Sequence, residues 1–227
     1  MARYFTQQSF DFLTALSNNN NREWFNDHKQ LYEDVVRSPA LEFIADMSDE
    51  LVTISAHFLA VRRKVGGSLM RVHRDVRFGK DKRPYKTNIG IQFRHELGKD
   101  VHAPGFYLHV EPDGCFIGAG IWRPDSTALG KIRDAIIEKG DAWLTSSGDK
   151  SFNKKFEISG ESLKTAPRGY AKDHPLIEDL RRKDFIALCN ISDKSVKSVR
   201  IKKQVVETFQ LAAPYMQFLC KALDLRY

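Results

Sequence analysis

Apolar side chains recur at helical spacing in the first quarter of the chain. Residues 6–37 place one at every third or fourth position, which is typical of amphipathic helices. The asparagine run at 18–21 predicts a break into two helices, because Asn side chains compete for backbone hydrogen bonds. A further helix is predicted from Ser38 and Pro39 to Phe58, since Ser caps a helix and Pro suits its first turn.

The middle of the chain changes from helical to strand periodicity. Apolar and polar residues alternate in 87–94, 106–111 and 115–122, and the turn sequence Pro-Asp-Gly at 112–114 separates the last two stretches. Short turns favour an antiparallel meander over a parallel sheet. Residues 69–76 are a candidate for one more strand.

The last hundred residues alternate between helical and extended patterns. The predicted fold class is α+β, with a mainly antiparallel sheet from the central region covered by N- and C-terminal helices in one domain over residues 1–227. The expected elements are a helix from Asp125 to near Gly140, short elements and loops over 141–170, a short helix over 175–182 capped by Asp173 or His174, a strand over 185–191, and a terminal helix over 199–223 broken at Pro214.

Composition narrows the class of protein. No stretch of eighteen apolar residues occurs, so no membrane partner is expected. The opening ten residues lack the pattern of a signal peptide. Three widely spaced cysteines form neither a disulfide framework nor a zinc motif, which indicates a reducing cytoplasm. The oligomeric state stays open.

Positive charge is concentrated in one segment. The formal net charge is +7, yet residues 62–86 hold ten Lys or Arg against two Asp, so the rest of the chain carries a net charge of −1. Such a local field favours an anionic partner, either a small molecule or nucleic acid. The alternative is a solvated basic loop balanced by acids elsewhere in the fold.

The densest part of this segment is residues 71–87, RVHRDVRFGKDKRPYKT, here called the basic loop. In an extended conformation Arg71, Asp75 and Arg77 share one face, so the carboxylate is expected to lie between two guanidiniums and to orient them. The candidate anion-binding donors are Arg71, Arg74, Arg77, Lys80, Lys82 and Lys86.

Several residues indicate that the basic loop is ordered. Gly79 permits an unusual backbone angle, Pro84 restricts the chain, and Phe78 and Tyr85 are apolar anchors. An ordered loop can present N–H groups and lysines to a phosphate or carboxylate. The chain has no G-x-x-x-x-G-K-[ST] motif, so this is not a P-loop.

Orienting and packing roles fall to Asp75, Asp81 and Tyr85. Asp81 is expected to pair with Lys82 or Lys86, or to tie the loop to the body of the protein. Tyr85 is expected to stack on a ligand or to pack beside it.

Candidates for catalysis are His73, Asp75 and His174. A histidine beside arginines should stay neutral, which suits a general base, although a helix-capping or core role is the commoner one. No metal or cofactor is expected: only His109 and Glu111 share a strand face, which gives two ligands at most. No nucleophile motif appears.

Other residues are candidates to join the basic loop at one cleft. Small residues at 118–120 permit close approach of a backbone or a ligand, and Arg123 follows them. Arg168 and Tyr170 lie in a later loop and are candidates for the same cleft.

Three blocks of sequence resemble a known family. The first is Phe12-x-x-x-Leu16 with the asparagine run and Trp24-Phe25, the second runs from Arg71 to Lys86, and the third is 118–124. They are similar to the domain-of-unknown-function 2461 family over nearly the whole chain. The resemblance implies a soluble, microbial, single-domain protein of mixed helix and sheet, and implies no activity.

Three functional hypotheses follow. The leading one is a binding module for an anionic, phosphate-bearing ligand, nucleic acid included, through the basic loop. The first alternative is an enzyme acting on a phosphorylated or carboxylated small molecule. The second is a structural ion-pair scaffold or protein-interaction surface. A small-ligand site predicts a deep pocket near the arginines, whereas nucleic acid predicts a broad basic face.

Overall fold

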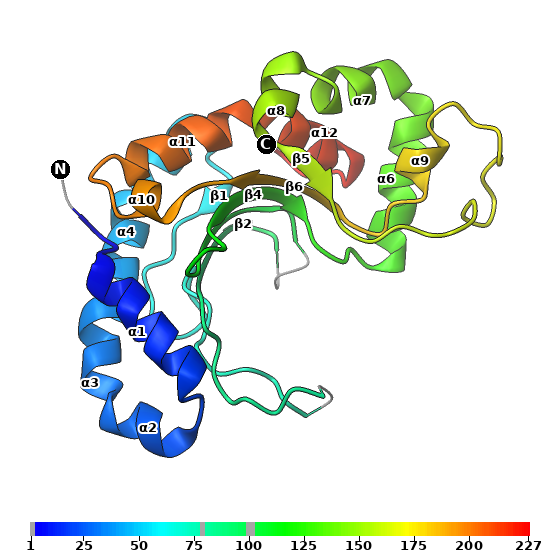
Figure 1. The fold of residues 1–227 in the computed structure, drawn as a ribbon. Coiled ribbons are helices and arrows are strands. Elements are labelled where there is room, and N and C mark those ends of the chain that lie inside the picture. Colours follow the sequence, from blue (N-terminus) through cyan, green and yellow to red (C-terminus); the bar gives the residue numbers. More distant parts are fainter. Residues whose placement is uncertain (1–2, 78–79, 99–102) are drawn as a thin grey trace.

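A six-stranded antiparallel sheet organises the described part of the chain in this computed structural model (Figure 1), which describes residues 3–77, 80–98 and 103–227. Its strand order is β1-β2-β3-β4-β6-β5. The central strands β2, β3 and β4 form the predicted meander, with Ile91 opposite Leu108 and Leu108 opposite Ile117. The strands are β1 Phe58–Leu59, β2 Ile89–His95, β3 Gly105–Val110, β4 Phe116–Ile121, β5 Glu157–Ser159 and β6 Phe185–Asn190.

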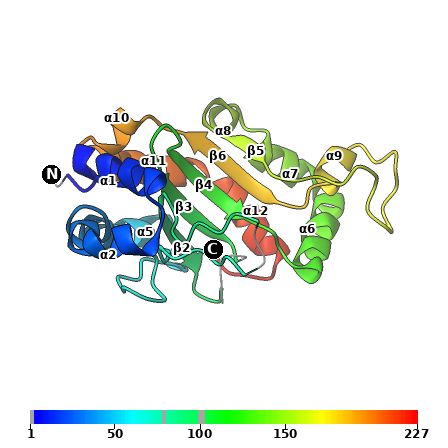
Figure 2. The same ribbon diagram turned by 60° about the horizontal axis from the view of Figure 1, so that its bottom comes forward.

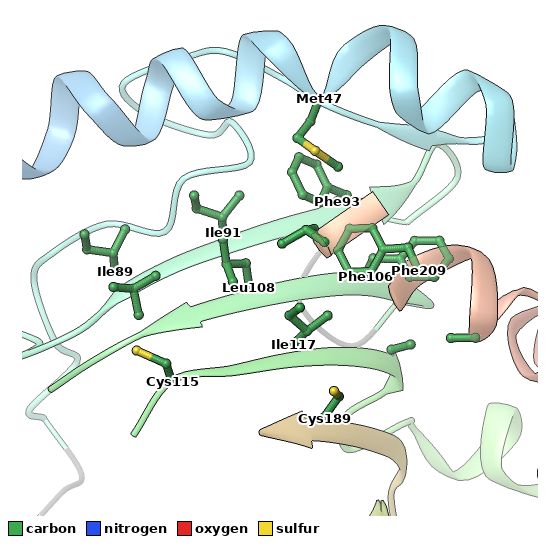
Figure 3. Close-up of a cluster of buried hydrophobic side chains, with 14 of the residues drawn as sticks. Met47, Ile89, Ile91, Phe93, Phe106, Leu108, Cys115, Ile117, Cys189 and Phe209 are labelled. Carbon is green, nitrogen blue, oxygen red and sulfur yellow. The ribbon is translucent and has the colours of Figure 1, made fainter. Parts of the chain in front are cut away.

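One face of the sheet carries the hydrophobic core. Alternate residues of the strands, such as Ile91, Phe93 and Phe106, are fully buried on this face. Phe209 packs on Phe106 with ring centroids 4.6 Å apart, and Met47 lies over the same cluster (Figure 3). Helices from both ends of the chain cover this convex face, as Figure 1 shows, so the predicted α+β arrangement is confirmed.

The N-terminal helices begin as the pattern predicts and then depart from it. The break at the asparagine run is confirmed, but Ser38 is helical and is not an N-cap, because helical turns continue into it from the preceding π-helix. The predicted helix to Phe58 divides at Met47, and Phe58 begins β1. The elements are α1 Gln7–Asn18, α2 Arg22–Asp27, α3 Lys29–Tyr32, the π-helix η1 Glu33–Arg37, α4 Ser38–Asp46 and α5 Ser48–Ile54.

The C-terminal half follows the prediction closely. Asp125 caps α6 by accepting from the Ala128 N–H at 2.8 Å, and the terminal helix is interrupted just before Pro214. Trp143 is fully buried beside Tyr215, which fixes α7 against α12. The elements are α6 Ser126–Glu138, α7 Gly140–Ser147, α8 Lys150–Lys155, α9 Ile177–Leu180, α10 Asp193–Val196, α11 Ile201–Leu211 and α12 Ala213–Ala222.

The basic loop folds back on itself beneath the other face of the sheet. The Arg74 N–H donates to the Pro84 carbonyl at 2.9 Å, and the Lys86 N–H donates to the Val72 carbonyl at 2.8 Å. The prediction of a strand over 69–76 was wrong: Leu69 forms an isolated bridge to Ile91 of β2 and His73 forms one to Tyr85, and neither bridge extends into a ladder. Phe78 and Gly79 lie outside the described residues.

Turning the molecule as in Figure 2 brings this open side of the sheet forward, with α1 and α2 at one end and α6 and α9 at the other. Within the described ranges, no helix is both long and apolar enough to cross a bilayer.

Candidate functional site

A pocket of about 440 Å³ lies on the face of the sheet opposite the core. It is called the sheet pocket below. It forms because the strand positions that alternate with the core residues carry glycine or polar and aromatic side chains. The lining residues are Met70, Lys86, Asn88, Gln92, Gly105, Tyr107, His109, Phe116, Gly118, Ala119, Gly120, Trp122, Ile186 and Leu188.

A hydrogen-bonded row of side chains, Tyr107, His109 and Glu111, follows the wall formed by β3. Tyr107 Oη lies 3.1 Å from His109 Nδ1, and His109 Nε2 lies 3.1 Å from Glu111 Oε2. A carboxylate can only accept, so Nε2 carries the imidazole proton and Nδ1 accepts from the Tyr107 hydroxyl. The Asn88 amide also points its nitrogen at Nδ1, at 3.4 Å, which fits the same tautomer.

Two contacts hold the middle and the Glu111 end of the row in place. The His109 ring stacks on Phe116, with centroids 4.6 Å apart and planes 9° from parallel. The Thr87 hydroxyl donates to the second oxygen of Glu111, Oε1, at 2.8 Å. This support fixes the imidazole orientation, as second-layer hydrogen bonds do in catalytic sites.

Burial sets the protonation states of the row. It lowers the pKa of His109, although the hydrogen bond and charge of Glu111 oppose it; the Lys86 charge adds to the lowering. It raises the pKa of Tyr107 to about 12, with the Glu111 charge contributing. Near neutral pH the site therefore holds a neutral imidazole and a neutral phenol.

Lys86 stands at the edge of the sheet pocket. Its side chain is half-buried, and burial, followed by the nearby Arg71 charge, lowers the pKa of its ammonium. Among the described residues its Nζ has no hydrogen-bond or ion-pair partner. An ammonium removed from water without a counter-ion is costly unless an anion joins it.

A second hollow of about 210 Å³ adjoins this lysine. This basic recess is lined by Arg74, Arg83, Tyr85, Lys86, Thr87 and Asn88. Asp81 holds its two guanidiniums together: Arg74 Nη1 donates to Asp81 Oδ2 at 2.5 Å, and Arg83 Nη2 donates to the same oxygen at 2.7 Å. The expected pairing of Asp81 with Lys82 or Lys86 was therefore wrong, because the guanidiniums of Arg74 and Arg83 occupy its carboxylate.

Packing against α2 anchors the basic loop. The Tyr85 ring is buried and stacks on Phe25, with centroids 4.0 Å apart. The Asn20 amide bonds the Tyr85 backbone on both sides, donating to its carbonyl and accepting from its N–H at 3.0 Å each. One asparagine of the run thus positions the loop, a role that the sequence did not indicate.

The tip of the loop contains a pair that the sequence anticipated in part. Arg77 donates two hydrogen bonds to the Asp75 carboxylate, from Nε to Oδ1 at 3.0 Å and from Nη2 to Oδ2 at 2.7 Å. Arg71 acts on that carboxylate through its charge. The Lys82 ammonium donates to the Val76 carbonyl at 3.0 Å. Arg77 and Lys82 are thus engaged within the loop, and Lys80 is exposed on it.

The Asp75 carboxyl gives a direct test of the loop conformation. The side-chain and then the backbone hydrogen bonds of Arg77 lower its pKa to about 2. We expect Arg77→Gln to raise this pKa toward its ordinary value, as measured by an NMR titration of the carboxyl carbon. Arg168→Gln, on a different loop, is the control. An Asp75 pKa that does not respond to Arg77→Gln would contradict the described loop.

The remaining predicted residues fall elsewhere. His73 is exposed at the loop arm, with its ring 5.1 Å from that of Tyr85. His174 Nδ1 accepts from the Leu176 N–H at 3.1 Å in the turn before α9. The N-cap of α9 is Leu176 and no side chain caps this helix, so the predicted cap by Asp173 or His174 was wrong. Neither lines the sheet pocket or the basic recess.

None of Arg123, Arg168 and Tyr170 lines the sheet pocket or the basic recess. Arg123 lies over the ring of Trp122, which lines the sheet pocket, and Arg123 Nη2 is 3.7 Å from Glu161 Oε1. Tyr170 donates to Asp134 on α6 at 2.8 Å. The loop holding Arg168 and Tyr170 projects beyond α9, far from the basic loop in both views (Figures 1 and 2).

The sequence missed Tyr107, Asn88 and Gln92 as site residues. A signal existed, because the alternation of β3 places Tyr107, His109 and Glu111 on the face opposite the core. Within the described ranges, no three His, Cys, Asp or Glu side chains gather closely enough to hold a metal ion.

Comparison with known families accounts for nearly the whole chain. The family described as "Conserved hypothetical protein (DUF2461)" matches residues 8–218. The chain belongs to the DUF2461 family. The matched span contains the whole sheet pocket, the basic recess and the row from Tyr107 to Glu111 of this DUF2461 protein. No curated protein and no solved structure matches the chain.

Proposed function

We propose that this DUF2461 protein binds a small anion whose apolar, ring-sized body enters the sheet pocket and whose phosphate or carboxylate group meets Lys86. The observation that carries the proposal is the half-buried Lys86 ammonium with no partner among the described residues, at the junction of an apolar pocket and a basic recess. Arg74 and Arg83, clamped by Asp81, add positive charge beside it.

The shape of the site favours a small ligand over a nucleic-acid strand. Pockets that hold small molecules are concave and mostly apolar with few polar groups, and their usual volumes include that of the sheet pocket. Arg77 and Lys82 at the loop tip satisfy groups within the loop, so they support its conformation more than a broad basic face. We place this binding in the cytoplasm, because the three cysteines are free and buried.

A ligand panel tests the proposal. Thermal shift and calorimetry on the wild-type protein would compare 1-naphthyl phosphate, 1-naphthoate, neutral 1-naphthol and inorganic phosphate. We expect the two naphthyl anions to bind more tightly than naphthol or phosphate alone, because each fills the pocket and meets Lys86. The stronger anion then identifies the head group.

Lys86→Met keeps the length of the side chain and removes its charge. We expect it to weaken binding of the better naphthyl anion about 10- to 100-fold, the usual contribution of a charge-assisted contact. The matched control is Lys82→Met, since Lys82 lies on the same loop with its ammonium bound to a backbone carbonyl. The proposal would be refuted if Lys86→Met and Lys82→Met lost the same affinity for the naphthyl anion. It would also be refuted if the protein bound single-stranded DNA tightly and with strong salt dependence but did not bind the naphthyl anions.

A further inference from the structure

We propose that the sheet pocket is an active site in which His109 and Tyr107 catalyse keto–enol tautomerisation of a small anion that carries a carbonyl group beside an apolar body. The inference rests on the proposed binding function and adds a reaction to it. It starts from the row Tyr107–His109–Glu111, whose first two members line the pocket.

The geometry assigns a base and an acid to neighbouring atoms. His109 Nδ1 is the proton acceptor, because its other nitrogen donates to Glu111. Tyr107 Oη, 3.1 Å away, is the acid, and its hydroxyl hydrogen can rotate from Nδ1 toward a ligand oxygen. A bound carbonyl that takes over this hydrogen exposes the Nδ1 lone pair to the adjacent C–H bond.

The reaction needs no other reactant. The C–H bond breaks, its proton goes to His109 Nδ1, and its electron pair forms the carbon–carbon double bond while the carbonyl π pair moves to oxygen. Tyr107 gives its proton to that oxygen and regains one from His109 through the same hydrogen bond. The net change is one proton moved from carbon to oxygen, and both residues return to their first state.

The surrounding groups favour this class of reaction. Positive charge from Lys86 stabilises the negative charge that develops on the substrate, and Glu111 stabilises the transient imidazolium. Among the described residues that line the sheet pocket there is no serine, threonine or cysteine to serve as a covalent nucleophile. A proton-transfer reaction therefore fits these side chains better than hydrolysis through a covalent intermediate.

The row also offers a route for exchange with water. Glu111 lines a further recess of about 170 Å³ on the α1 side, together with Leu13, Thr14, Ser17, Asn18, Thr87 and Pro112. Its side chain is 38% exposed. A proton on His109 can thus exchange with solvent through Glu111 without leaving by the pocket mouth.

Deuterium exchange measures the proposed step directly. Phenylpyruvate has an aromatic body, a carboxylate and a carbonyl beside a CH₂ group, and proton NMR in D₂O follows the loss of the CH₂ signal. We expect the wild-type protein to accelerate this loss over buffer. His109→Gln should reduce the protein-dependent rate at least about 100-fold, and Tyr107→Phe at least about 10-fold.

The chain offers a matched control. His57 also pairs with a glutamate, its Nδ1 lying 2.6 Å from Glu96 Oε1, and neither residue lines the sheet pocket. His57→Gln should leave the exchange rate unchanged. Phenylglyoxylate, which has no C–H bond next to its ketone, tests by thermal shift whether His109→Gln still folds and binds.

The dependence of the rate on pH separates catalysis from a structural role. The groups facing His109 are Tyr107, Asn88, Glu111 and the Lys86 charge. The lowered pKa of His109 keeps its imidazole in the base form below the ordinary imidazole value of about 6.5. The rate should therefore begin to fall only at a pH below that value. The lowered pKa of Lys86 should make the alkaline fall begin below the usual lysine value.

The outcomes distinguish the two proposals. Binding of phenylglyoxylate and phenylpyruvate without accelerated exchange refutes the tautomerase and leaves the binding function standing. Acceleration that His109→Gln and His57→Gln leave equally intact also refutes it. If the wild type neither binds these probes nor accelerates exchange, the proposed reaction is refuted. If the naphthyl anions also fail to bind, the binding function is refuted as well. Acceleration that only the pocket variants remove supports both.

Discussion

Gly120→Ala is expected to destabilise the protein by about 3–5 kcal/mol, a large part of the stability of an ordinary domain. Gly120 lies in β4 with φ of +127°, a backbone angle that residues with a Cβ rarely adopt. A Cβ there would lie 1.9 Å from the carbonyl oxygen of Phe185 on β6. Strands β4 and β6 would have to separate to accept it, which disrupts the pairing of Gly120 with Ile186.

Urea denaturation followed by circular dichroism measures this cost. Gly118→Ala is the matched control, because Gly118 lies in the same strand and its Cβ would lie 3.5 Å from Leu188 Cδ2, an ordinary contact. We expect this control to change the free energy of unfolding by less than about 1 kcal/mol. Similar values for the two variants would show that β4 and β6 do not approach as closely as described.

The helices and strands were predictable wherever burial imposes one period. The meander β2–β3–β4 and strand β6 follow from alternation, because each buries one face against Met47, Phe209 and their neighbours. The course of the chain around Ser38 was not predictable, since it depends on a π-helix that passes into α4 without a break. Rules for helix caps consider only a few neighbouring residues, so they do not show that one helical segment continues into the next.

The candidate site was predictable only where charge marks it. Lys86 and Arg74 were visible in the basic loop, but their neighbours depend on strand register, which a single sequence leaves open. Tyr107 was not singled out from the alternating residues of its strand, although Asn88 and Phe116 enclose the face on which it lies. His73 and His174 were chosen because arginines lie near them in the sequence. The histidine that lines the pocket is His109, and its orientation and tautomer are fixed by a hydrogen bond to Glu111, two residues later.

Gly118→Leu is expected to weaken binding of the naphthyl anions at least about 100-fold while the protein stays folded. A Cβ at Gly118 has ordinary contacts with Leu188 and Tyr107, so the larger side chain can extend into the sheet pocket and occupy the space of the ligand body. Loss of apolar burial and overlap with the ligand both act against binding. Calorimetry with 1-naphthyl phosphate and 1-naphthoate measures the loss.

This variant separates the pocket from the charge beside it. Gly118→Leu leaves Lys86, Arg74 and Arg83 in place, whereas Lys86→Met leaves the pocket open. Gly130→Leu is the control for the substitution itself, because a Cβ at Gly130 on α6 meets open space. If Gly118→Leu and Gly130→Leu bind the anions as the wild type does, the ligand lies in the basic recess alone and His109 cannot reach it. If Gly118→Leu alone loses binding, the ring-sized body lies against Tyr107 and His109, where a proton can pass between them.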